Sequence, residues 1–135
     1  IECAGRAEHE GTEFSSTGPQ ARSILRDQTS TARIVVNIFD GGPRTRVSYH
    51  MANHQGSVTA PVEMRPRSGP DPFTVLSFCR YRDDIKSWVE PAMCSHLWDA
   101  PFPAALGAGS YRLVIRWTDE YGRTFEDISI VEIFG

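Results

Sequence analysis

The sequence lacks any long apolar run. None of its apolar stretches approaches the roughly 18 residues that a membrane-spanning helix requires. It also lacks an excess of basic residues, because 14 Lys and Arg residues stand against 17 Asp and Glu residues, which gives a net charge of −3. Domains that bind nucleic acids usually carry a basic stripe. We therefore expect neither a membrane span nor a nucleic-acid partner.

Catalytic and metal-binding motifs are also missing. The sequence contains no nucleophile elbow, no glycine-rich phosphate loop and no helical pair of carboxylates. It has no Cys-x-x-Cys and no cysteine beside a pair of histidines. The sequence therefore assigns no catalytic residue and no metal ligand, although a catalytic triad can be assembled in space from distant residues.

The start of the sequence shows neither a Met nor the charged and apolar segments of a signal peptide. Two interpretations stay open: a leader has been removed, or the chain is a piece of a longer polypeptide. Residues 1–30 hold few large apolar side chains and no sustained period. They predict an irregular N-terminal arm or the tail of a preceding domain, with one short element at ARSILRD. The main domain is expected over residues 31–135.

The three cysteines, Cys3, Cys79 and Cys94, allow one disulfide within the chain. Cys79 and Cys94 bracket a short segment that contains Trp88 and ends near a proline, which makes them the better pair. Closing a loop of that length stabilises a protein by about 3 kcal/mol if the geometry fits. Three reduced thiols agree with the sequence equally well.

Two segments alternate with the period of a β-strand. In TARIVVNIF, residues 31–39, the side chains of Ile34, Val36 and Ile38 share one face. In RTRVSYHM, residues 44–51, the inward positions are Val47, Tyr49 and Met51. With DGGP between them, the two segments predict a β-hairpin. PVEMRP, residues 61–66, predicts a further short strand.

The middle of the chain is harder to interpret. FTVLSFCRYRDDIKSWV, residues 73–89, fits neither period well, and we expect a short helical insertion there, with Asp71 as its N-cap. HLWDAPFP, residues 96–103, predicts a short strand that ends at prolines. YRLVIRWT, residues 111–118, alternates cleanly.

The last segment, TFEDISIVEIF, changes phase, because Val131 and Ile133 stand at odd positions and Ile128 and Ile130 at even ones. This change predicts a bulge or a strand that is buried on both faces. Several short strands with turns between them, and no long helical pattern, predict a mainly β fold. The expected architecture is an antiparallel Ig-like β-sandwich with a short helical insertion.

Residues 96–127, HLWDAPFPAALGAGSYRLVIRWTDEYGRTFED, resemble the C-terminal domain of bacterial calcineurin-like metallophosphoesterases. The earlier segment ARIVVNIFDGGPRTRVSYHM also looks like a strand pair of that family, so the resemblance covers roughly residues 31–134. Residues 1–30 do not show the further strand, rich in Gly, Asp and Tyr, that family members usually carry. The residues that match the family pattern are His96, Leu97, Trp98, Gly109, Tyr111, Thr118, Asp119, Tyr121, Gly122, Arg123, Thr124 and Phe125.

The resemblance implies a non-catalytic accessory domain that packs on or gates a catalytic phosphoesterase domain absent from this chain. Such a parent enzyme is a hydrolase that uses two divalent metals about 3.5–4 Å apart to activate water. The metal-binding motifs of the superfamily are not found here; Asn53-His54 is the nearest approach, and it lacks the flanking Gly and acid. The resemblance further implies export, to a secreted or periplasmic location.

The turn TDEYGRTFED carries two large aromatic residues, Tyr121 and Phe125. We expect Gly122 to take a positive φ and Arg123 to pair with Asp119 or Glu120, or to stack on Tyr121. The aromatic rings are expected to fold back over the end of the sandwich. The same corner is a candidate docking surface; the candidate interface residues are Tyr121, Arg123, Phe125, His96, Trp98 and Trp88.

A second function also agrees with the sequence. The chain could be a free-standing Ig-like module that binds a glycan or a protein through its loops. An exposed groove lined by tryptophans would favour that function, and a catalytic domain preceding this chain would favour the accessory one. The sequence does not identify the substrate of a parent enzyme, and no motif makes this chain itself an enzyme.

Overall fold

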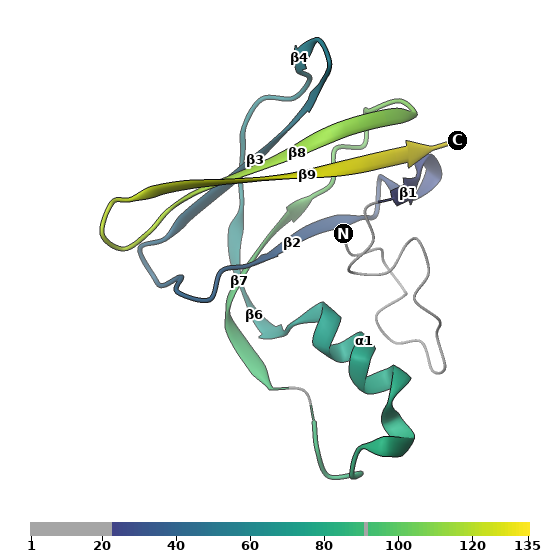
Figure 1. Cartoon of the computed structure of the whole chain (residues 1–135), viewed down its shortest axis with the longest axis vertical. Helices are drawn as coiled ribbons and strands as arrows, with labels where there is room; N and C mark the ends of the chain where they lie inside the picture. The colour runs from purple at the N-terminus through teal and green to yellow at the C-terminus, as the bar shows by residue number, and fades with distance from the viewer. Residues whose placement is uncertain (1–22, 91) are drawn as a thin grey trace.

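The computed structural model describes residues 23–90 and 92–135, which form two β-sheets and one short helical insertion (Figure 1). The large sheet has the order β1-β9-β8-β3-β4, and β5 also pairs with β3. Its strands are β1 (Ser23–Leu25), β3 (Arg46–Asn53), β4 (Gly56–Ser57), β5 (Val62–Glu63), β8 (Gly109–Thr118) and β9 (Thr124–Phe134). All its pairs are antiparallel except β1 with β9.

The small sheet has the order β2-β7-β6, and both of its pairs are antiparallel. It consists of β2 (Arg33–Asn37), β7 (Met93–Pro101) and β6 (Arg65–Pro70). Between β6 and β7 the chain forms α1 (Pro72–Arg80) and the 3-10 turn η2 (Arg82–Asp84); a second 3-10 turn, η1 (Arg26–Gln28), follows β1. Asp71 caps α1 as expected, since its Oδ1 accepts a hydrogen bond from the Thr74 N–H at 3.2 Å.

The core lies between the two sheets. The period-two alternation is clearest in β3, where Val47, Tyr49 and Met51 point inward and are each at most 2% exposed. Tyr49 also uses its polar end, because its hydroxyl donates to the Pro101 carbonyl at 2.6 Å, and burial raises the pKa of that hydroxyl. The expected mainly β sandwich with a short helical insertion is confirmed. The buried apolar residues that form the core are Ile24, Ala32, Ile34, Ile38, Val47, Tyr49, Met51, Met64, Trp98, Ala100, Phe102, Leu113, Val131 and Ile133.

The expected hairpin of residues 31–51 is wrong, because β2 and β3 belong to different sheets. After β2 the backbone stays on β7: the Ile38 N–H donates to the His96 carbonyl at 2.9 Å. Gly41 then passes so close to Trp98 that an added Cβ would lie 2.3 Å from the indole ring. The loop therefore crosses from one sheet to the other, and the alternation that predicted both strands does not identify their partners.

The phase change in β9 has a different cause from the two that we expected. The register of β9 with β8 runs without a shift from Ile133 to Thr124, so there is no bulge. Val131 and Ile133 point into the core, whereas Ile128 and Ile130 are 50% and 55% exposed. The strand is therefore buried on one face only, and it presents isoleucines on the other.

The short element expected at ARSILRD corresponds to β1 and η1, and Ile24 of β1 is 1% exposed in the core. Residues 1–22 lie outside the described residues, so the division of the chain at residue 31 stays a prediction. No helix among the described residues is long and apolar enough to span a membrane.

Candidate docking site

The turn between β8 and β9 is fixed by its own backbone. The Gly122 N–H donates to the Asp119 carbonyl at 3.1 Å, and the Asp119 N–H donates to the Arg123 carbonyl at 2.9 Å. Gly122 has a φ of 79°, as expected, and this conformation is strained for residues with a Cβ. The turn therefore has one defined shape.

The carboxylate of Asp119 lies inside this turn, where its side chain is 5% exposed. Its Oδ1 accepts from the N–H groups of Tyr121 and Arg123, both at 2.9 Å, and its Oδ2 accepts from Arg123 Nε at 2.6 Å. Burial by itself would raise the pKa of Asp119, but these hydrogen bonds and the Arg123 charge outweigh it and hold that pKa below its ordinary value. The expected pairing of Arg123 with Asp119 is confirmed.

The aromatic side chains of the hairpin surround the same arginine. The Arg123 guanidinium lies 5.5 Å from the centroid of the Tyr121 ring and 5.8 Å from that of Phe125, within the range of cation–π attraction. Phe125 stacks on Trp117, with 5.5 Å between the ring centroids. Tyr121 is 84% exposed, so the expectation that it folds back over the core is wrong. Asp119 accepts a hydrogen bond from the backbone N–H of Tyr121, while the ring of Tyr121 lies in solvent.

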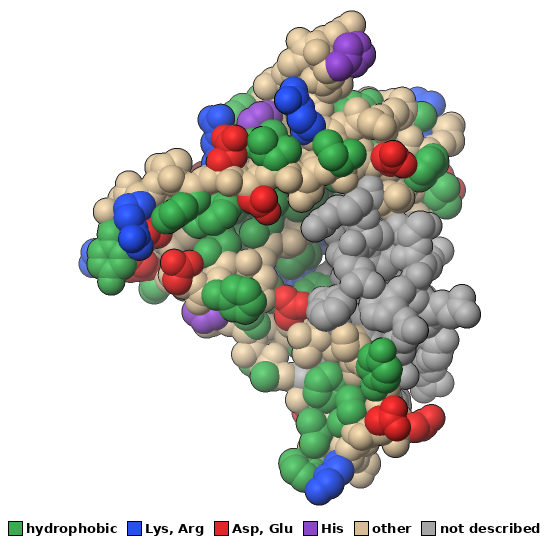
Figure 2. Space-filling model, viewed as in Figure 1, with side chains coloured by type: hydrophobic (Ala, Val, Ile, Leu, Met, Phe, Trp, Pro, Cys, Tyr) green, Lys and Arg blue, Asp and Glu red, His purple; other side chains and the backbone are tan. Residues whose placement is uncertain are grey.

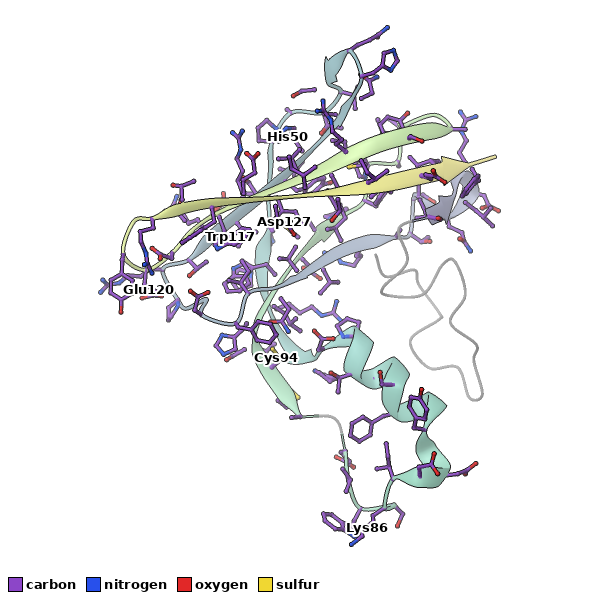
Figure 3. All side chains as sticks on the ribbon, in the orientation of Figure 1. His50, Lys86, Cys94, Trp117, Glu120 and Asp127 are labelled. Carbon is purple, nitrogen blue, oxygen red and sulfur yellow. The ribbon has the colours of Figure 1, made fainter. Side chains whose placement is uncertain are left out.

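A second loop joins the hairpin at this end of the molecule. The Arg44 N–H donates to Glu120 Oε1 at 2.8 Å, and Glu120 also packs against Gly42. Phe39, in the same loop, is 86% exposed. We call the hairpin residues Glu120, Tyr121, Arg123 and Phe125, together with Phe39 and Arg44 of the loop bonded to them, the hairpin end; Glu120 and Trp117 mark its position in Figure 3.

The remaining candidate interface residues lie elsewhere. Trp98 is 2% exposed and belongs to the core. His96 Nδ1 lies 2.8 Å from the Gly41 carbonyl, so this ring ties β7 to the crossing loop. Trp88 is 76% exposed, but it lies beyond the helical insertion, next to Lys86, far from Glu120 (Figure 3). The structure therefore brings Tyr121, Arg123 and Phe125 together and separates Trp88 from them.

Two further expectations concern cysteine and metal. The side chain of Cys79 lies outside the described residues, so the expected pairing of Cys79 with Cys94 stays a prediction. His54 is exposed in the turn after β3, where the Gln55 N–H donates to Asn53 Oδ1 at 2.8 Å. Among residues 23–90 and 92–135, no three His, Cys, Asp or Glu side chains gather closely enough to hold a metal ion.

Sequence reasoning missed Phe39, Arg44 and Glu120 as members of this surface. No local signal identifies them, because Arg44 and Glu120 are brought together by the pairing of β3 with β8, which aligns Arg46 with Thr118. It also missed the stacking of Trp117 on Phe125. The register could have shown it, since the two residues face each other across β8 and β9.

Comparison with known protein families identifies a family to which the chain is similar. A family model described as the C-terminal of calcineurin-like phosphoesterase matches residues 6–125. The match starts earlier than the resemblance in the sequence suggests, and it includes part of the region expected to be an arm. No curated protein and no solved structure matches the chain.

Proposed function

Because this chain belongs to the family of C-terminal domains of calcineurin-like phosphoesterases, we propose that it is a non-catalytic accessory domain that packs on a catalytic domain and gates it. The family match supports a catalytic domain as its partner. The hairpin end is the surface that makes this contact. The parent protein is then a metal-dependent hydrolase, and this chain contributes a binding surface to it.

The observation that carries the proposal is the composition and rigidity of the hairpin end. Tyr121 and Phe39 are 84% and 86% exposed, and Arg123 lies against the Tyr121 ring. Tyrosine and arginine are enriched among the residues that dominate binding energy at protein interfaces. The buried Asp119 carboxylate already holds the turn in place, so little conformational freedom is lost when a partner binds.

The metal chemistry belongs to the catalytic domain in this proposal. Two divalent ions would activate water for attack on phosphorus, and the resemblance to the family implies Asp, His and Asn side chains as their ligands. The described residues gather no such set. In this proposal the chain affects catalysis indirectly. The hairpin end contacts the catalytic domain and fixes its position.

The test measures binding of this chain to the separately produced catalytic domain of its parent polypeptide by isothermal titration calorimetry. We expect Tyr121→Ala and Phe39→Ala each to weaken the affinity about tenfold or more, because both rings would be buried in the contact. Their side chains are mostly in solvent in the free domain, so the fold should survive both changes.

Trp88→Ala is the matched control, since Trp88 is equally an exposed aromatic residue with a cation beside it. Its affinity is expected to stay within about twofold of the parent chain. The proposal fails if the two hairpin-end variants bind as tightly as the parent chain, or if Trp88→Ala is the variant that loses binding. Gating is tested on a single polypeptide that contains both the catalytic domain and this chain. If the chain gates the catalytic domain, Tyr121→Ala should change kcat or KM for the hydrolysis of p-nitrophenyl phosphate.

Within residues 23–90 and 92–135, no observation favours the alternative of a free-standing Ig-like binding module. Its mark would be a groove lined by tryptophans, but Trp98 is in the core and Phe125 stacks on Trp117. Export of the parent protein to a secreted or periplasmic location remains part of the proposal, and the fold's Ig-like character is likewise proposed. Fractionation of the cells that produce the full protein tests the location.

A further inference from the structure

Most of the outer edge of β9 is unpaired among the described residues. β8 pairs with one edge of β9 along nearly its whole length, but β1 pairs with the other edge only at Glu132, Ile133 and Phe134. No other described strand pairs with Thr124–Val131 on that side. An exposed strand edge offers a row of backbone donors and acceptors to another chain.

The hydrogen-bond pattern shows which groups face this edge. The Asp119 N–H bonds to the Arg123 carbonyl, so these two residues form a hydrogen-bonded pair. Hydrogen-bonded and non-hydrogen-bonded pairs alternate along an antiparallel ladder. The even-numbered residues, Glu126, Ile128 and Ile130, therefore point their N–H and C=O groups away from β8. These groups can bond an added strand while every β8–β9 hydrogen bond remains intact.

The side chains along the edge are apolar and acidic. Ile128 and Ile130 are half-exposed on the outward face, where β-branched residues pair well with a neighbouring strand. Asp127 lies on the opposite face and is exposed (Figure 3), and no described cation pairs with it. Residues 124–135 include three acids and no Lys, Arg or His. Figure 2 shows this band of apolar and acidic side chains where β9 runs in Figure 1.

From this geometry we propose that the open edge of β9 binds an extended peptide segment that carries Lys or Arg among apolar residues. The segment adds to the large sheet as a further strand. Its apolar side chains lie beside Ile128 and Ile130, and a basic side chain lies opposite Asp127. Strand addition of this type takes affinity from main-chain hydrogen bonds and specificity from side chains. The inference does not depend on the proposed role as an accessory domain.

Charge argues against the two nearest other occupants. A second copy of the chain would place one acidic β9 against another, and like charges across a strand pair are destabilising. Residues 1–22 hold more acidic than basic side chains, and Gly18-Pro19 stands just before β1, where both residue types weaken a strand. A basic segment of a partner protein fits the edge better.

A tethered strand tests the proposal on the full chain. A seven-residue strand of alternating Val and Thr, with two Lys near its end, is fused behind Gly135 through a flexible Gly-Ser linker. The linker carries the strand past β1, and the tether raises its local concentration. Antiparallel addition then sets the lysines beside Glu126 and Asp127. The control fusion replaces the two Lys residues by Glu.

Hydrogen exchange of individual amides provides the readout. The amides of Glu126, Ile128 and Ile130 should exchange about tenfold more slowly with the lysine strand than in the unfused chain, because each gains a hydrogen-bond partner. The glutamate strand should change them by less than about twofold. Equal protection by both strands, or none by the lysine strand, overturns the proposal.

Two variants separate strand addition from other binding. Asp127→Lys should reverse the preference, so that the glutamate strand gives the greater protection. Ile128→Pro removes one N–H that faces the open edge and should abolish the slowing at Glu126 and Ile130. If Asp127→Lys leaves the preference unchanged, the charge argument is wrong.

The unfused chain provides the last discriminating outcome. If the three amides are already slow in it, the edge is occupied by another segment of the chain or by a second copy, and the proposal is overturned. Dependence of that protection on protein concentration identifies the second copy.

Discussion

The hairpin end and the turn around Trp88 both present an exposed aromatic ring with a cation beside it. Arg123 lies 5.5 Å from the Tyr121 ring centroid, and Lys86 lies 5.8 Å from that of Trp88. The two sites differ in the hydrogen bonds that hold the backbone under each ring. Three hydrogen bonds to the buried Asp119 carboxylate position the hairpin end, whereas the bond from the Val89 N–H to the Lys86 carbonyl is the one described backbone bond within residues 85–90.

This comparison separates exposure from preorganisation. An exposed ring on a loosely held turn must lose conformational freedom when a partner binds, and this loss offsets part of the contact energy. The Asp119 network has already removed that freedom at the hairpin end during folding. The hairpin end is therefore the better docking surface, although the side chain of Trp88 is larger than that of Tyr121.

The largest effect is expected from Asp119→Ala, which removes the acceptor of three hydrogen bonds in the turn. The Tm should fall by several degrees, since two backbone N–H groups and the Arg123 guanidinium lose their partner. Lys86→Ala, the matching change at the other site, should shift the Tm by about 1 °C or less, because surface changes of this kind have small effects. Differential scanning calorimetry compares them, and equal shifts would remove the distinction between the two sites.

Phe125→Ala should cost about 1–2 kcal/mol in the free energy of unfolding, because it removes the ring stacked on Trp117 and the partly buried apolar contact between the two rings. Trp88→Ala should cost less than about 0.5 kcal/mol, since its ring is mostly in solvent. Urea unfolding followed by circular dichroism gives both values. A larger loss for Trp88→Ala than for Phe125→Ala would contradict the exposed position of the Trp88 ring.

Gly122→Ala should cost about 1 kcal/mol, because a Cβ at a φ of 79° strains the backbone. Gly107→Ala is the control, since an added Cβ there meets nothing within 4 Å and its φ is not positive. Its free energy of unfolding should stay within about 0.5 kcal/mol of the parent chain. If the two variants unfold at the same urea concentration, the turn is not held in its left-handed conformation.

The smallest expected effect is a change in the Tm with pH. The pKa of Asp119 is lower in the folded chain than in the unfolded one, so its charged form contributes stability above the unfolded value of about 4. That contribution is lost as the pH falls through the folded pKa. The Tm difference between the parent chain and Asp119→Asn should therefore be constant near neutral pH and shrink below about pH 4. A difference that grows on acidification would contradict the lowered pKa.

The features that sequence reasoning predicted are local. The period-two alternation placed Ile34, Val47 and Leu113 on inward faces, because a strand turns its side chains by half a revolution per residue. The pairing of Arg123 with Asp119 and the positive φ of Gly122 are set within a single turn. In each case the residues that decide the structure are close together in the sequence.

The features that it missed depend on contacts between distant segments. The expected hairpin failed because the partner of β2 is β7, and the only local sign was Gly41, which has to fit beneath Trp98. The hairpin end also includes Phe39, which the crossing loop carries there. The phase change in β9 was detected, but its meaning depended on whether the outward face of the large sheet is covered.

The parallel pair of β1 and β9 has a consequence for folding. Ser23 pairs with Glu132, so almost the whole described chain separates two residues that lie side by side. Contacts between such distant residues slow folding, because a long loop must close before they contribute any energy. During synthesis, Ile24 has no place in the core until β9 has left the ribosome. Folding of this domain is therefore expected to end with the pairing of β1 and β9, although β1 is synthesised before every other described strand.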